Sequence, residues 1–187
     1  MIYKKRMDYR TVNLERVGWV NGRAYYGGAG KVMVQTPTAP CQIAPTPAFG
    51  PHARSISLKY ATARTAGFRE FVAALEQAAE ENDARTVHGR RLAESVDWDG
   101  TFRVSTFGET VWFDADGRHV EGPSSEWNAC ACLLQLMGVW ISSRGSWGLK
   151  WRVLECKEMP LPVGEASACL FRDDFVVGGG SSPLFRD

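Results

Sequence analysis

The chain lacks the two bulk features that would place it at once among membrane proteins or strongly basic proteins. Its 22 Lys and Arg residues balance 21 Asp and Glu residues, which leaves a net charge of +1. Nucleic-acid-binding domains are usually basic, so this sum taken alone argues against that class. The longest apolar run, Ala129–Ile141, has 13 residues and is too short for a membrane-spanning helix. Hydrophobic residues still make up 44% of the 187 residues, which predicts an ordinary globular core.

Cysteine is sparse and irregularly spaced. The five cysteines are Cys41, Cys130, Cys132, Cys156 and Cys169. An odd number without regular spacing does not suggest a secreted disulfide framework. Cys130 and Cys132 are close, but a second pair is absent and the three histidines are scattered, so we expect buried free thiols, no metal and no cofactor. No apolar stretch of signal-peptide length follows the first residues, and we expect a soluble protein in a reducing, intracellular compartment.

Common catalytic motifs are also missing from the sequence. The glycine cluster at 27–30 lacks the Lys and Ser or Thr of a phosphate-binding loop, and it predicts a turn. Asp97, Asp99, Asp114 and Asp116 could form a carboxylate pair or the metal site of a nuclease. All four lie within three residues before a glycine, where aspartate commonly serves turns, and we favour that interpretation. We therefore expect no enzymatic activity.

The near-zero net charge hides a strong segregation along the chain. Residues 1–69 carry 11 basic and two acidic residues, a net charge of +9. Residues 70–126 carry five basic and 13 acidic residues, a net charge of −8, and the remainder is balanced. Such a division is compatible with a basic groove on one face and an acidic face opposite, so neutrality excludes no class of ligand.

The hydrophobic periodicity predicts an α+β fold that is mainly β. Strand-like segments are expected at 17–20, 24–26, 31–35, 55–60, 101–107, 109–113, 130–142 and 149–158. Asn21-Gly22 and Asp116-Gly117 predict hairpin turns. The segment 36–51 contains five of the nine prolines and predicts an extended loop. The expected architecture is a small antiparallel β-barrel interrupted by a helix.

The clearest helix is expected over 66–81, with a shorter one at 84–95. Phe68, Phe71, Val72, Leu75 and Ala79 recur at helical spacing and predict the buried stripe. Thr65 is the expected N-cap. The expected solvated face carries four acids, Glu70, Glu76, Glu80 and Glu81.

Aromatic residues are interleaved with cations on several strand-like segments. This combination binds single-stranded nucleic acid, because bases stack on rings while cations follow the phosphates. The sequence also allows the alternative that many of the seven tryptophans form the core, and Trp151 is expected to be buried beside Leu149 and Val153 while Lys150 and Arg152 point outward. The candidate nucleic-acid-binding residues are Arg23, Tyr25, Tyr26, Lys31, Arg54, Lys59, Arg103, Trp112, Arg144, Trp147, Lys150 and Arg152.

The carboxy-terminal segment differs in composition from the rest of the chain. We predict a domain over 1–160 and a flexible tail over 161–187, in which the tetrapeptide Leu-Phe-Arg-Asp occurs twice around a Gly- and Ser-rich stretch. Short apolar anchors in such a tail predict docking to a protein partner. The candidate partner-binding residues are Leu170, Phe171, Asp173, Asp174, Phe175, Leu184 and Phe185.

Residues 18–160 resemble the single-stranded DNA-binding proteins of short-tailed phage replisomes and related proteins of large eukaryotic DNA viruses. The resemblance is carried by a helix at 68–81 after the strand at 55–60, by Thr101-Phe102-Arg103-Val104, by the turn 114–117, and by the closing strands 130–142 and 148–153; the segment 34–37 resembles the viral branch. It implies an OB-fold and a role in coating unwound DNA. Family members often carry an acidic tail that ends in an aromatic residue, whereas this tail is less acidic and ends in Asp187.

Two functional hypotheses follow from the sequence. The first is a non-enzymatic single-stranded DNA-binding protein of viral replication or recombination, without sequence specificity, able to form homo-oligomers and located in a virus replication compartment or in the host nucleus or cytoplasm. Its partners would be single-stranded DNA and, through the tail, replication proteins. The alternative is a virion structural or adaptor protein that uses the Pro-rich loop and the tail as protein contacts.

Overall fold

A computed structural model describes residues 7–46, 53–124 and 127–161 of the chain. The strands are β1 (Met7–Asp8), β2 (Val17–Val20), β3 (Arg23–Tyr26), β4 (Val32–Gln35), β5 (Ala39–Pro45), β6 (Arg54–Lys59), β7 (Arg91–Leu92), β8 (Thr101–Thr106), β9 (Val111–Phe113), β10 (His119–Val120), β11 (Ala129–Ile141) and β12 (Ser146–Glu158). The α-helices are α1 (Ala66–Asn82) and α2 (Ala84–Val87), and two short 3₁₀-helices, η1 (Tyr9–Thr11) and η2 (Leu14–Arg16), precede β2. No helix in these ranges is both long and apolar enough to cross a membrane.

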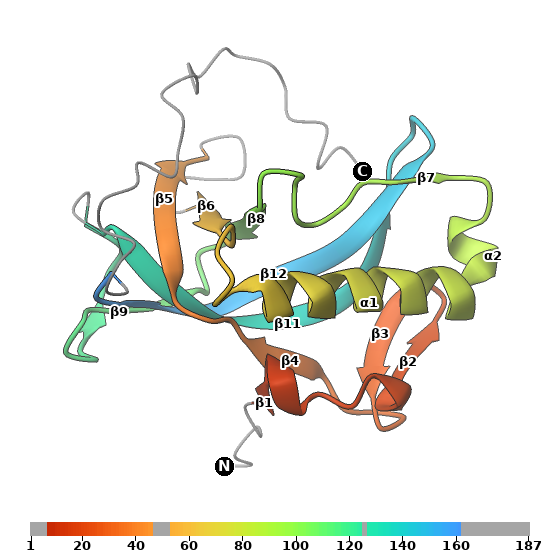
Figure 1. The fold of residues 1–187 in the computed structure, drawn as a ribbon, viewed down its shortest axis with the longest axis horizontal. Coiled ribbons are helices and arrows are strands. Elements are labelled where there is room, and N and C mark those ends of the chain that lie inside the picture. The colour runs from red at the N-terminus through yellow and green to blue at the C-terminus, as the bar shows by residue number, and fades with distance from the viewer. Residues whose placement is uncertain (1–6, 47–52, 125–126, 162–187) are drawn as a thin grey trace.

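The long antiparallel hairpin of β11 and β12 forms the centre of the sheet (Figure 1). The main strand order is β10-β9-β12-β11-β5-β6-β8, while β3 and β4 pair with other stretches of β11 and β7 pairs with β12. The hydrogen-bonded order of the described strands starts at β10 and ends at β8, so this sheet is not closed. It curls into an OB-like α+β fold, mainly β, as the sequence predicts.

The helix α1 packs its apolar stripe into the curve of this sheet. The ring of Phe68 is fully buried, with its centroid 4.7 Å from that of Tyr60 and 5.8 Å from that of Phe102. Phe102 in turn meets the ring of Trp151 edge-on at 6.0 Å, which joins β8 to the inner side of β12. The predicted stripe is confirmed, since each of its five residues is buried.

The local turn signals are confirmed at the hairpin of β2 and β3. Asn21 has φ 50° and Gly22 has φ 74°, both in the left-handed region that a two-residue type I′ turn requires. The Asp83 carboxylate accepts a hydrogen bond from the Gly22 N–H at 2.7 Å, which holds this turn against the end of α1.

The Pro-rich segment departs from the expected loop. Its middle part, Ala39–Pro45, is the strand β5, which pairs with β11 at Ala39 and Pro40 and with β6 from Cys41 onward. The prolines lie at the second and last positions of this strand, where a missing N–H disturbs a ladder least. Composition alone therefore mispredicted a strand that bridges the two halves of the sheet.

The structure corrects three further expectations around α1. The second helix ends at Val87, and Arg91–Leu92 is a strand instead of helix. Thr65 occupies the N-cap position, but its hydroxyl bonds the Thr62 carbonyl and makes no cap hydrogen bond. Glu76 is buried, not solvated: it accepts the Ser95 N–H at 2.6 Å, and loss of water around it raises the pKa of its carboxyl.

An ion pair with a buried ammonium group replaces one of the predicted DNA contacts. Lys59 is 7% exposed, and its Nζ lies 2.7 Å from an Asp99 carboxylate oxygen and 3.2 Å from the Thr101 hydroxyl. The hydrogen bonds that the Asp99 carboxylate accepts from Lys59 and from Thr101 lower the pKa of Asp99 to about 2. An ammonium held in this way is not available to a phosphate, so the assignment of Lys59 to the nucleic-acid surface is wrong.

Replacing Asp99 by Asn is expected to destabilise the fold by about 1–2 kcal/mol at neutral pH, because Lys59 would remain buried without its carboxylate. The Asp99 side chain is 36% exposed, which keeps the expected loss modest. The folded pKa of Asp99 lies below its ordinary value of 3.8, so its contribution is complete above that pH and is lost as the pH falls toward 2.

Urea unfolding of Asp99→Asn at several pH values measures this contribution. Asp116→Asn is the control, because Asp116 pairs with Arg118 at an exposed turn and its replacement should cost less than about 0.5 kcal/mol. Equal losses in the two variants at neutral pH would contradict a special role for the Lys59–Asp99 pair.

Candidate nucleic-acid interface

Strand alternation gives the β11–β12 hairpin two different faces. The inner face of β12 carries Trp147, Leu149, Trp151 and Val153, all of them buried. Lys150 is exposed and Arg152 half-exposed on the outer face, and the expectation that Trp151 lies in the core is confirmed. Two register shifts in the pairing, between Leu133 and Leu134 and between Leu136 and Gly138, mark bulges that bend the hairpin.

Two tryptophans proposed for base stacking lie in the core instead. Trp147 is 1% exposed and Trp112 is 6% exposed, and the ring of Trp112 packs edge-on against Trp127 at 5.9 Å. Both side chains lie at inward-pointing positions of their strands, so neither ring has a face exposed for stacking on a base. The prediction that Trp112 and Trp147 bind nucleic acid is therefore wrong for this structure.

The register brings Arg23 and Lys150 onto one row of the sheet. Gly138 of β11 pairs with Arg23 of β3 on one side and with Lys150 of β12 on the other. Residues paired in this way project from the same face, and two strand spacings separate Arg23 from Lys150 by about 10 Å. Arg152 projects from the row of Gln135, the next outward residue along β12. Three cations that the sequence proposed separately are thus neighbours on the outer face.

Trp140 adds a half-exposed aromatic ring to the same face. It pairs with Gly148, and a Cβ placed at Gly148 would lie 2.8 Å from the Trp140 ring, so the indole lies across this glycine. Trp140 occurs among the aromatic and cationic residues of the sequence, yet it is not among the candidates chosen from it. The signal that could have found it is the glycine opposite, which leaves room for a flat ring.

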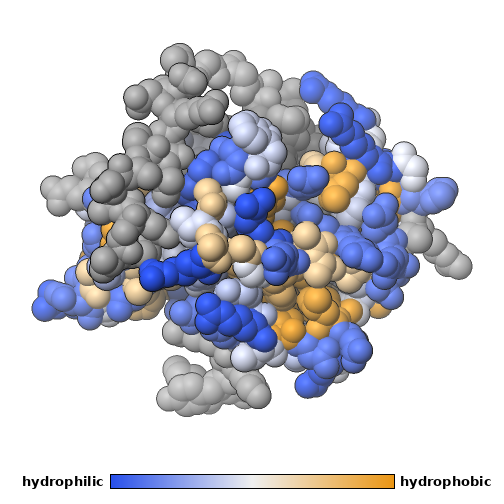
Figure 2. All heavy atoms as spheres, viewed as in Figure 1, coloured by the Kyte–Doolittle hydropathy of each residue, from blue (hydrophilic) through white to orange (hydrophobic). Residues whose placement is uncertain are grey.

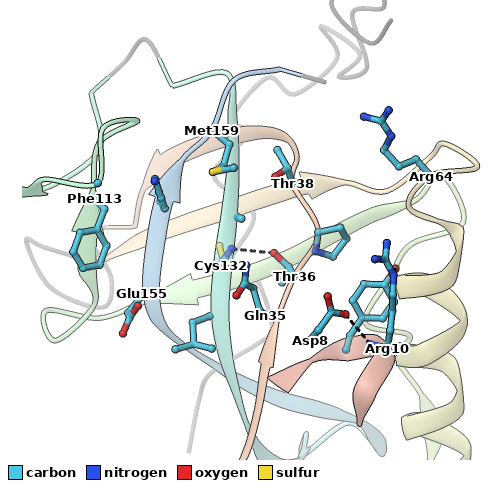
Figure 3. Close-up of a pocket in the computed structure, with 16 residues that line it drawn as sticks. Asp8, Arg10, Gln35, Thr36, Thr38, Arg64, Phe113, Cys132, Glu155 and Met159 are labelled. Atoms are coloured by element: carbon cyan, nitrogen blue, oxygen red, sulfur yellow. Dashed lines mark hydrogen bonds between the residues drawn. The ribbon is translucent and has the colours of Figure 1, made fainter. Parts of the chain in front are cut away.

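The other end of the outer face holds a groove of about 790 Å³ (Figure 3). Lys157 lines it, in register with Ala131 of β11 and with Phe113 of β9. Arg10 and Arg64 stand on the opposite rim, across the strand β4. A groove with a half-exposed phenyl ring and three cations can hold a base beside its phosphate.

We call the set of outward residues on this hairpin and its neighbours the outer-face strip. Its members are Arg23, Phe113, Trp140, Lys150, Arg152 and Lys157. Two acidic residues reduce the positive charge of the strip. Glu109 forms an ion pair with Arg152, and Glu155 projects between Arg152 and Lys157. The strip is therefore a basic track with interruptions, not a uniformly basic surface.

Most of the remaining candidates lie away from this strip or are already engaged. Arg103 forms an ion pair with Asp97, and Arg54 donates to the Ala53 carbonyl; both belong to the β6–β8 part of the sheet. The guanidinium of Arg16 lies over the ring of Tyr26, with its carbon 4.9 Å from the centroid. For three further candidates the structure gives a position and an exposure. Tyr25 of β3 is half-buried, Lys31 is exposed after the turn that follows β3, and Arg144 is exposed at the tip of the β11–β12 hairpin.

Within the described residues, the basic side chains of the first third of the chain do not gather into one patch. Arg10 and Arg64 reach the groove and Arg23 reaches the strip, whereas Arg69 lines a different depression together with Glu70, Glu76 and Glu80 of α1. On the face that carries α1, hydrophilic residues surround smaller apolar areas (Figure 2). The proposed partner-binding residues, Leu170 through Phe185, lie outside the described residues, and the domain boundary near 160 stays a prediction.

Comparison with solved structures finds similar chains, among them two phage proteins. No family model and no curated protein matches the sequence. The chain is similar to gp2.5, a single-stranded DNA-binding protein encoded by bacteriophage T7, with 13% identity and a TM-score of 0.45 over 73% of this chain and 96% of that one. It is also similar to a carboxy-terminal truncation of the single-stranded DNA-binding protein from bacteriophage Enc34, with 12% identity and a TM-score of 0.41 over 81% and 98%.

Proposed function

We propose that this protein binds single-stranded DNA along the outer-face strip, without sequence preference. The observation that carries the proposal is the succession of Trp140, then the Arg23 and Lys150 row, then Arg152, on one face of the β11–β12 hairpin and the adjoining strand β3. Cations at neighbouring rows can follow a phosphate backbone, while an indole at the end of the track offers a stacking surface to any base.

The groove supports a path for the strand beyond these rows. Lys157 and Phe113 continue the outer face, and Arg10 and Arg64 face them across the groove. A polynucleotide laid along the strip would therefore meet aromatic rings at both ends and cations between them. Unpaired bases suit such a surface, because a ring can stack only on a base whose face is free.

The biological setting is a further part of this proposal. On the sequence resemblance given above, we infer that the protein coats unwound DNA in viral replication or recombination and is non-enzymatic, and that its tail recruits protein partners. The tail lies outside the described residues, so this part rests on its repeated tetrapeptide and on composition alone.

Fluorescence anisotropy with a labelled oligothymidylate, titrated at several salt concentrations, tests the binding. We expect the logarithm of affinity to fall linearly with the logarithm of salt, by about 0.7 for each phosphate contact. Trp140→Ala is expected to weaken binding by about 5- to 150-fold at every salt concentration, since one stacked base contributes roughly 1–3 kcal/mol.

Binding to double-stranded DNA of the same length, and Trp98→Ala, serve as controls. Trp98 is 83% exposed and lies in the turn before β8, away from the strip. Its replacement should leave the affinity unchanged. Absence of single-strand binding at low salt would refute the function, and equal effects of the two tryptophan substitutions would refute the site.

A further inference from the structure

Three thiols converge in the core of the sheet, beside the groove that Cys132 also lines. They belong to Cys130 and Cys132 of β11 and to Cys156 of β12, and their sulfur atoms all lie within 4.8 Å of one another. The Cys132 and Cys156 sulfur atoms are 3.6 Å apart. All three residues are at most 1% exposed.

The strand register creates this cluster. Cys130 and Cys132 are two residues apart on β11, so both thiols project from the inner face. Cys156 pairs directly with Cys132 across the antiparallel ladder. A fourth thiol, that of Cys41, lies on the neighbouring strand β5, in which Ala39 pairs with Cys130; its sulfur atom is 3.9 Å from the Trp127 carbonyl oxygen. The sequence separates these residues by up to 115 positions, which is why spacing alone indicated no metal site.

The distances suit a thiophilic metal ion. In a tetrahedral site with Zn–S bonds of about 2.3 Å, two thiolate sulfurs lie roughly 3.8 Å apart. The Cys132–Cys156 separation already has this length within 0.2 Å. The other separations among the three sulfurs are at most 4.8 Å and so exceed it by no more than about 1 Å, which a change of side-chain rotamer can close.

Polar groups around the cluster can complete such a site. The Thr36 hydroxyl accepts the Cys132 N–H at 2.9 Å and fixes the backbone of that ligand. The Tyr60 hydroxyl lies within electrostatic reach of Cys130, Cys132 and Cys156 and is completely buried. In the described part of the chain it makes no hydrogen bond of normal geometry. A metal-bound thiolate would give this O–H an acceptor, and such outer contacts are typical of metal sites.

We propose that Cys130, Cys132 and Cys156 bind a structural Zn²⁺ ion, with Cys41 as the fourth ligand. Because the thiols are sealed from solvent, the ion is taken up during folding and each ligating thiol releases its proton at that stage. The ion ties β5, β11 and β12 together at the point where the two parts of the sheet join. This inference does not depend on DNA binding.

Metal analysis of the full chain, purified without chelators from zinc-supplemented cells, tests the site directly. We expect about one zinc per chain. After refolding with Co²⁺ we expect thiolate-to-cobalt charge-transfer absorption and the visible bands of tetrahedral cobalt. A chain without metal that shows five titratable thiols on unfolding would overturn the proposal. A Cys132–Cys156 disulfide, seen as two thiols that appear only after reduction, would also overturn it.

Three variants assign the ligands. Cys156→Ser is expected to lose the metal, whereas Cys169→Ser, which changes the remaining cysteine, should retain one zinc per chain. Cys41→Ser is expected to weaken zinc retention against a competing chelator by about 10- to 100-fold. Undiminished retention in Cys41→Ser would refute the fourth ligand. Should Cys156→Ser fail to fold, the metal content and the cobalt spectrum of the unmodified chain still decide the question.

Discussion

Reversing the charge at both Arg23 and Lys150 is expected to weaken single-stranded DNA binding about 100-fold at low salt. The two residues flank Gly138 on one row of the outer face, so a strand that follows the strip meets both. Each reversal removes one phosphate contact and places a carboxylate beside the backbone. The slope of log affinity against log salt should therefore become shallower by about 1.4 in Arg23→Glu/Lys150→Glu.

The single reversals provide a charge-matched comparison with a residue outside the strip. Lys150→Glu and Arg69→Glu change the net charge equally, but Arg69 lies on α1 among acidic residues. Only Lys150→Glu should change the salt slope. If both reversals weaken binding to the same extent, the interaction depends on overall charge, and the outer-face strip is not the site. Circular dichroism and unfolding curves verify that each variant is folded.

The fold could be predicted because its elements carry local signals. The apolar stripe from Phe68 to Ala79 and the turn at Asn21-Gly22 are each specified by a few neighbouring residues. The strand β5 could not be predicted in this way, because its prolines suggest a loop and only its partners, β6 and β11, stabilise the extended chain as a strand. Tertiary pairing overrides local preference there.

The candidate site was predictable only in part. The alternation of inward and outward side chains along a strand explains which of its residues could be predicted. Alternation along β12 correctly separated Lys150 and Arg152 from Trp151. The same alternation places Trp147 in the core. It was proposed for base stacking because cations are its neighbours in the sequence. Lys59 was misassigned for a different reason, because its partner Asp99 lies 40 residues away and only the pairing of β6 with β8 brings the two together. Charge in a sequence does not reveal which cations are already neutralised.

The thiol cluster could not be predicted from spacing for a related reason. Cys130 and Cys132 alone form a pair too close in sequence to resemble a usual zinc motif. The third and fourth thiols come from strands that reach the same point only after β5, β11 and β12 have paired. Register across a sheet, not distance along the chain, determines which side chains can share a ligand.

Gly138→Ala is expected to destabilise the fold by about 3 kcal/mol or more. Gly138 has φ 143°, and a Cβ at this position would lie 1.9 Å from the Gly22 carbonyl oxygen and 2.8 Å from the Arg23 Cα. These are backbone atoms, so no rotamer change relieves the overlap, and the β2–β3 turn must move away. The Val139 N–H would then lose its 2.9 Å hydrogen bond to Gly22.

The same glycine couples stability to the proposed site, because its bare backbone lets Arg23 approach Lys150. Thermal unfolding measures the loss of stability in Gly138→Ala, and DNA titration well below the unfolding temperature measures the change in DNA affinity. Gly18→Ala is the matched control: Gly18 lies in β2, a Cβ there meets nothing within 4 Å, and the change should alter stability by less than about 0.5 kcal/mol. Gly138→Ala should also weaken DNA binding, because displacement of the β2–β3 turn moves Arg23 out of the row of Lys150. A folded Gly138→Ala protein with undiminished affinity would mean that the strand does not pass over this row.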